Sequence, residues 1–141
     1  MSIESKTDQT VDKIMLPLER CPVVASTAII KEVLDIMDHH KLGVVFIVDN
    51  QGQLAGVLTE GDVRRLLLRV QKPLAALMTD DVSGYAVQTP VAIEAGLRLV
   101  EAMSLMTEKK IWDLPVIEKS GRMIGLLHMH QIVQAVMSKF D

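Results

Sequence analysis

Two stretches of the chain carry the same pattern, and their match decides the fold. Residues 44–58 read VVFIVDNQGQLAGVL, and residues 113–127 read DLPVIEKSGRMIGLL. Gly52 matches Gly121 and Gly56 matches Gly125 at one constant offset (121 − 52 = 125 − 56 = 69). Self-similarity at a fixed offset is the signature of a repeated structural unit. The sequence therefore predicts an internal duplication.

The duplication extends beyond these two stretches. The same offset matches Met37 with Met106 and Val63 with Ile132 without a gap. Nearer the start, residues 14–15 (Ile-Met) match residues 77–78 (Leu-Met) at an offset of 63 (77 − 14), which predicts six extra residues (69 − 63) in the second copy around positions 80–87. We therefore expect a first repeat at residues 11–70 and a second at residues 74–137, after a flexible N-terminus at residues 1–10.

Each copy reads as a short strand, a helix, two strands and a final helix. In the first copy the helix is predicted by the i, i+3, i+4, i+7 spacing of Ile30, Val33, Leu34 and Met37. The turn DNQG at residues 49–52 favours a hairpin between the next two strands. The order β-α-β-β-α, given twice, is an α/β (α+β) fold. We expect the two repeats to pack sheet to sheet, because one three-stranded unit cannot close a core well alone.

Composition excludes several classes of function. The net charge of −3 gives no basic surface for nucleic acid. No apolar run approaches the roughly 18 residues that a membrane span needs. The single cysteine excludes an intrachain disulfide framework, so we expect a cytoplasmic protein. The sequence suggests no catalytic residues and no metal site. The high aliphatic content predicts exposed apolar helix faces, and we therefore expect a homodimer.

The repeated pattern resembles a pair of cystathionine-β-synthase (CBS) domains, a Bateman module. The likeness is carried by residues 56–65, GVLTEGDVRR, which are similar to the family's Gly-h-h-[Ser/Thr]-x-x-Asp ending, where h is an apolar residue. With residues 127–130, LHMH, this stretch is especially similar to the CBS tail of arabinose-5-phosphate isomerases. The sugar-isomerase domain that precedes that tail is absent from this sequence, so the resemblance does not imply isomerase activity.

The candidate site lies where the third strand of the first copy meets its last helix. The Asp62 carboxylate can accept hydrogen bonds from the hydroxyls of a ribose, and the Thr59 hydroxyl can donate and accept. Gly61 allows a close backbone approach, and Arg64 and Arg65 could bind phosphate oxygens at the helix start. The resemblance implies that Thr59 and Asp62 contact an adenosine ribose. Because Thr-x-x-Asp is also a helix-capping pattern, the capping interpretation stays open.

Other candidate residues complete the predicted site. Apolar walls for a base would come from Val24, Val45 and Phe46. In the second copy His128 stands at the Thr59 position and Gln131 at the Asp62 position (128 − 59 = 131 − 62 = 69). We therefore expect one competent nucleotide site, with His128 reaching a phosphate or sugar acid.

The predicted function is that of a stand-alone regulatory module that binds an adenine nucleotide or a nucleotide-sugar, without a required cofactor and with AMP, ADP or ATP as possible ligands. We expect the module to pass its ligand state to a regulated partner protein. Two alternatives remain open at this point. One is a ligand-free dimerisation module, and the other is a regulatory subunit of an enzyme that acts on sugar phosphates or nucleotide-sugars.

Overall fold

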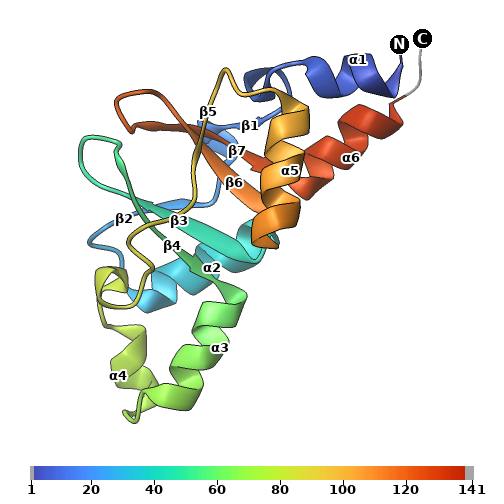
Figure 1. Ribbon diagram of the computed structural model, residues 1–141. Helices are drawn as coiled ribbons and strands as arrows, with labels where there is room; N and C mark the ends of the chain where they lie inside the picture. The colour runs from blue at the N-terminus through green and yellow to red at the C-terminus, as the bar shows by residue number, and fades with distance from the viewer. Residues whose placement is uncertain (1, 139–141) are drawn as a thin grey trace. The chain divides into compact units, whose positions relative to one another are not determined.

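The structure, a computed structural model, describes residues 2–138 and contains both predicted repeats (Figure 1). The elements of the first repeat are β2 (Val23–Ala25), α2 (Ile30–His40), β3 (Val44–Val48), β4 (Leu54–Thr59) and α3 (Glu60–Arg69). Those of the second are β5 (Ile93–Glu94), α5 (Leu99–Lys109), β6 (Asp113–Ile117), β7 (Met123–His128) and α6 (Met129–Met137). The predicted order of elements and the mixed α/β fold with two sheets are confirmed.

Each repeat is preceded by a lead-in segment. The first lead-in contains α1 (Ile3–Asp8), the 3₁₀ turns η1 (Val11–Lys13) and η2 (Leu18–Arg20), and β1 (Leu16–Pro17). The second contains α4 (Leu74–Met78) and η3 (Val82–Gly84). The chain folds as two compact units, and each lead-in belongs to the unit built by the other repeat. The first unit spans residues 22–90, and the second joins residues 1–21 to residues 91–141. The compact units therefore divide the chain differently from the sequence repeats.

The two lead-ins are equivalent at an offset of 71, not 63. Val11 and Val82 (82 − 11 = 71) are both fully buried, one in the core of each unit. Their N–H groups donate to Leu97 O and Ala28 O at 2.9 and 2.8 Å. The expected match of residues 14–15 with 77–78 is wrong, and so is the six-residue insertion. The first copy instead has two more residues (71 − 69) between its lead-in and its body.

The two sheets differ by one strand. The first unit holds the order β2-β3-β4, with β2 parallel and β4 antiparallel to β3. The second holds the order β1-β7-β6-β5, because β1 adds an antiparallel edge strand to β7. Both hairpins turn on a glycine with positive φ, Gly52 at 82° and Gly121 at 96°, a conformation that other residues rarely adopt.

The core of each unit lies between its sheet and the first helix of its repeat. Side chains alternate along β3, so Val45 and Ile47 point toward α2 and pack with its buried residues Val33 and Met37. In the second unit Leu99, Ala102 and Met106 of α5 are fully buried in the same way. Helical spacing in sequence therefore becomes one apolar face that the sheet covers.

The N-terminal segment differs from expectation. We expected residues 1–10 to be flexible, but residues 3–8 form α1, which contacts α5 and α6. Lys6 is 3% exposed, and its ammonium group donates to the carbonyl oxygens of Val136, at 3.2 Å, and Ser138. These carbonyls close α6, where the helix dipole favours a cation. No helix among residues 2–138 is long and apolar enough to cross a membrane.

Candidate functional site

The Thr59–Asp62 motif forms a reciprocal cap at the start of α3. The Thr59 hydroxyl accepts a hydrogen bond from the Asp62 N–H at 3.1 Å, and Asp62 Oδ2 accepts one from the Thr59 N–H at 2.9 Å. The capping interpretation of this motif is therefore correct as local structure. It leaves further lone pairs of the Asp62 carboxylate for a ligand, while the Thr59 hydroxyl also hydrogen-bonds to that carboxylate. Capping and ligand contact are compatible.

Arg65 holds the carboxylate from the other side. Its Nη2 donates to Asp62 Oδ1 at 2.9 Å, one helical turn away. Burial by itself would raise the pKa of Asp62, but hydrogen bonds from Arg65 and from Thr59 outweigh it and lower the pKa below its usual value. The carboxylate, whose side chain is 21% exposed, is thus kept ionised and accessible.

The two glycines of the motif, Gly56 and Gly61, lie close to other atoms of the chain. A side chain at Gly61 would meet the Arg65 guanidinium at 3.2 Å, so Gly61 makes room for the arginine that reaches back to Asp62. A side chain at Gly56 would lie 3.1 Å from Val87 O, because the second lead-in crosses β4 there and bonds to Val57. Both glycines accommodate the chain's own atoms.

Arg64 lies on a different part of the helix from the Asp62–Arg65 pair. It lines a hollow between α2 and α3 together with Val63 and Leu67. Consecutive helical residues point about 100° apart, so Arg64 and Arg65 cannot serve one anion as neighbours on a face. The structure brings together Thr59, Asp62 and Arg65, but not Arg64.

The expected apolar wall is divided between two faces of the sheet. Val45 is fully buried on the α2 side. Phe46 points to the opposite face, which it shares with Thr59 because Val44 pairs with Thr59 and side chains alternate. Phe46 is 1% exposed. Val24 pairs with Ile47, three residues from Val44, so it lies roughly 10 Å along the sheet from Thr59.

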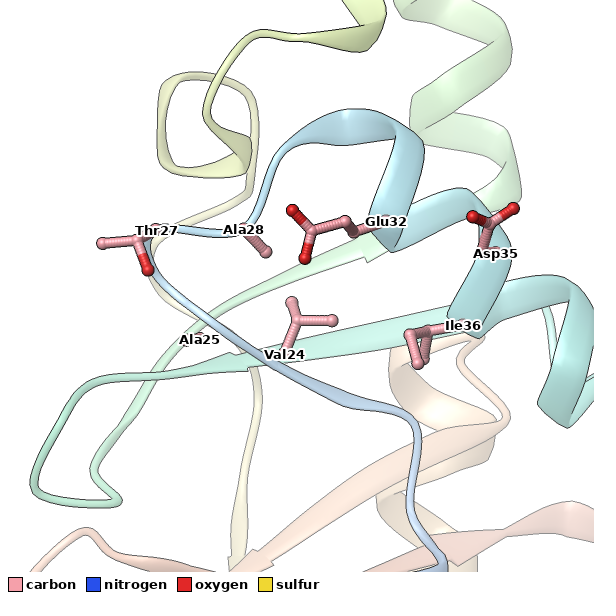
Figure 2. A pocket seen from close by; sticks show the side chains of 7 residues that line it. All are labelled: Val24, Ala25, Thr27, Ala28, Glu32, Asp35 and Ile36. Atoms are coloured by element: carbon pink, nitrogen blue, oxygen red, sulfur yellow. The ribbon is translucent and has the colours of Figure 1, made fainter.

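Val24 instead faces a separate hollow of about 480 Å³ between β2 and α2 (Figure 2). Its side chain points toward Glu32 and Ile36, and the hollow also carries Asp35. Asp35 pairs with Lys31 at 2.8 Å, and Glu32 accepts the Ile29 N–H at 3.5 Å at the helix start.

In the second unit His128 pairs with Asp113. His128 Nδ1 lies 2.5 Å from Asp113 Oδ1, and the Gln131 side-chain oxygen accepts the His128 N–H at 2.8 Å. Burial raises the pKa of Asp113, although His128 acts in the opposite direction. His128 Nε2 has no partner in the described chain, and it is not a buried unsatisfied atom, so it contacts solvent. His128 lies in the second unit and Thr59 in the first.

The sequence reasoning missed Asp113. It stands at the Val44 position (113 − 44 = 69), and β6 pairs it with His128 just as β3 pairs Val44 with Thr59. An aspartate in place of a buried valine, opposite a histidine in place of a threonine, was the available signal. Among residues 2–138 no three His, Cys, Asp or Glu side chains are grouped so that they could hold a metal ion.

These features agree with the comparisons to known proteins. The CBS domain family matches residues 11–69 and 75–138, and the chain belongs to this family. It is 29% identical over 123 residues to the arabinose 5-phosphate isomerase GutQ of Shigella flexneri, a match that covers 81% of this chain and 34% of that protein. It is 32% identical over 106 residues to the inosine-5'-monophosphate dehydrogenase of Aquifex aeolicus, covering 74% of this chain and 20% of the enzyme.

Among solved structures, CBSX2 in complex with AMP superposes with a TM-score of 0.81 at 25% identity, covering 92% of this chain and 96% of that one. A crystal structure of CBSX2 from Arabidopsis thaliana, a CBS-pair protein, superposes with a TM-score of 0.81 at 24% sequence identity. The chain spans only about a third of the length of the first curated relatives it matches, which include a Helicobacter pylori protein of uncharacterised function at 36%.

Proposed function

We propose that this CBS pair is a regulatory module that binds an adenine nucleotide through Thr59 and Asp62 of the first repeat. The observation that carries the proposal is the ionised Asp62 carboxylate, which is fixed in place and retains lone pairs for a ligand. A ribose diol needs an acceptor for its hydroxyl hydrogens and a donor to its oxygens. Asp62 provides the first, and the Thr59 hydroxyl provides the second when it turns its hydrogen from Asp62 to the ligand. The likeness to a structure that holds AMP supports this ligand class.

Arg65 is the phosphate-binding candidate of this proposal. Its side chain is 46% exposed, and it spends one N–H on Asp62. A guanidinium has five N–H donors, so four remain for phosphate oxygens. Gly61 keeps the space that the guanidinium occupies. Arg65 would thus bind the phosphate while it continues to orient the carboxylate that binds the ribose.

The proposed mechanism is differential binding without covalent chemistry. A nucleotide that binds one conformation of the module more tightly shifts the population toward it, and a partner protein that recognises this conformation responds. A second candidate is a regulatory subunit for an enzyme of sugar phosphates, which the similarity to the CBS region of GutQ favours. Both candidates predict the same ligand site and differ in the partner.

A thermal-shift panel of AMP, ADP, ATP, S-adenosylmethionine and a CMP-sugar tests the proposal. A ligand at a hundred times its dissociation constant stabilises the folded state by roughly 2.7 kcal/mol. We expect at least one adenine nucleotide to raise the melting temperature of the wild type. If none of the panel does so, the nucleotide proposal is wrong.

A further inference from the structure

The second unit carries uncharged side chains at the positions where the first unit carries its ion pair. The Asp62 position holds Gln131 (131 − 62 = 69), and the Arg65 position holds Gln134 (134 − 65 = 69). Gln134 is exposed and follows Gln131 by about one helical turn, so the two amides lie on the same side of α6. The residues of α6 include no Asp, Glu, Lys or Arg. Two amides therefore replace the carboxylate and the guanidinium of the first unit.

The glycine beside the arginine has changed together with it. A side chain at Gly61 would meet the Arg65 guanidinium at 3.2 Å, so the first unit needs a small residue there. The second unit has His130 at this position (130 − 61 = 69), where Gln134 brings no guanidinium to accommodate. The two replacements agree with each other, because a site without the guanidinium does not need the glycine.

His128 presents a hydrogen-bond acceptor beside these amides. Its Nδ1 lies 2.5 Å from Asp113 Oδ1, so Nδ1 carries the hydrogen of the neutral ring and Nε2 carries the lone pair. Within residues 2–138 this Nε2 has no partner. The Gln131 side-chain oxygen accepts the His128 N–H at 2.8 Å, which leaves both amide hydrogens of Gln131 as donors. The start of α6 thus offers an acceptor and two donors, and none of these atoms carries a formal charge.

We propose that His128, Gln131 and Gln134, which we name the amide site, bind an uncharged ligand with hydroxyl groups on adjacent carbons, and not a nucleotide. One ligand hydroxyl would donate to His128 Nε2, and the Gln131 amide would donate to a hydroxyl oxygen. The amide site has no equivalent of the guanidinium that would hold a phosphate in the first unit. A nucleoside and a free sugar both have the required hydroxyls. The inference rests on the nucleotide site proposed above, because each residue is interpreted through its match in the first unit.

Calorimetric titration of adenosine, ribose and AMP into Asp62→Ala tests the amide site, because this variant disables the nucleotide site and leaves the second unit unchanged. At pH 8, where histidine side chains are neutral, we expect adenosine or ribose to bind, and AMP to bind no more tightly than adenosine. Which of the two binds distinguishes a nucleoside from a free sugar. Adding Gln131→Met, which removes the amide hydrogens without adding a charge, should weaken this binding by about tenfold. No binding of either compound, or binding that Gln131→Met leaves unaltered, would overturn the proposal.

Restoring the guanidinium tests why the amide site would reject a phosphate. In the Asp62→Ala background, Gln134→Arg with His130→Gly should make AMP bind about tenfold more tightly relative to adenosine. Val133→Arg with His130→Gly is the matched control, because Val133 is exposed and points about 100° away around α6, and it should leave this ratio unaltered. An equal gain in both variants, or no gain in the first, would contradict the proposal. The nucleotide site fails on Asp62→Ala and the amide site on Gln131→Met, so the two failures are distinguishable.

Discussion

His128 Nδ1 lies 2.5 Å from Asp113 Oδ1, across the antiparallel pair of β6 and β7. In the first unit the same cross-strand position holds Val44 and Thr59. Two substitutions that are far apart in sequence have therefore replaced an apolar and hydroxyl pair by a histidine–carboxylate pair. The second repeat keeps the scaffold of the first but presents a different set of hydrogen-bonding atoms.

Removing His128 leaves a mostly buried carboxylate without its partner. We expect His128→Ala to lower the free energy of unfolding by about 1–3 kcal/mol, measured by urea denaturation. The double variant Asp113→Val/His128→Thr installs the pair of the first repeat and should recover most of this loss, because neither new side chain needs a charged partner. A double variant less stable than His128→Ala would contradict this account of the pair.

The loss in His128→Ala should depend on pH. Burial raises the pKa of Asp113, so the folded state binds a proton more readily than the unfolded state. The stability that such a group contributes is present at low pH. It decreases as the pH rises from the ordinary carboxylate pKa, about 4, through the raised pKa of the folded state. The difference between wild type and variant should therefore be smaller at pH 4 than at pH 7. A difference that is constant with pH would show that lost packing, not the carboxylate, is responsible.

We expect the contribution of Asp62 to stability to depend on pH in the opposite direction. Its pKa is lowered in the folded state, so its contribution is present above the ordinary carboxylate value and is lost as the pH falls through the folded value. Relative to the wild type, Asp62→Asn should lose stability at pH 7 and lose little at pH 2. Denaturant titrations of both proteins at the two values measure this, and equal differences at both pH values would contradict it.

Glycines at the crossing lead-ins should be sensitive to a single methyl group. A side chain at Gly125 would lie 2.7 Å from Leu16 O, which is backbone, whereas one at Gly56 would lie 3.1 Å from Val87 O. We expect Gly125→Ala to destabilise by about 1–3 kcal/mol and Gly56→Ala by less. Gly84 and Gly96 have open space and no positive φ, so their alanine variants should be neutral or slightly stabilising. Equal losses at all four positions would contradict the crossing as the cause.

Cys21 should be unreactive in the folded protein. Burial, with a smaller effect of Glu19, raises the pKa of its thiol to about 12, so almost none is thiolate at pH 8. Iodoacetamide should modify Cys21 slowly in native buffer and rapidly in 6 M guanidinium, at a denaturant concentration well above the transition of most domains. Fast modification of the native protein would show that the first lead-in opens readily.

The bodies of the repeats were predictable from sequence, and the lead-ins were not. Spacings such as Val33 and Met37 in α2 and the glycine turns are local, so periodicity reports them directly. Val11 and Val82 are equivalent because each fills the core of the unit built by the other repeat, a relation that follows from the fold and not from neighbouring residues. Asp113 was missed for the same reason, because its role depends on His128, a cross-strand partner 15 residues away.

The motif of the candidate site was predictable from sequence, but the arrangement of its side chains was not. Thr59 and Asp62 could be singled out in sequence because residues of these types, three positions apart, are typical of a helix start. The roles of Arg64 and Arg65 could not be separated in sequence, since only helix geometry places one beside Asp62 and the other beside Leu67. The burial of Val45 and Phe46 could not be predicted in sequence for a similar reason. Side chains alternate along β3, but which of them are exposed depends on what covers each face of the sheet.

Calorimetric titration of AMP into the wild type, Asp62→Ala and Gln131→Ala tests the central claim most directly. Gln131 is the matched control, because its side chain caps α6 as Asp62 caps α3, so both variants lose a comparable cap. The account predicts one AMP per chain in the wild type, unchanged binding in Gln131→Ala, and a loss of roughly tenfold to a hundredfold in Asp62→Ala. Binding that survives Asp62→Ala unchanged, or that is lost in Gln131→Ala, would contradict a ribose site at Thr59 and Asp62.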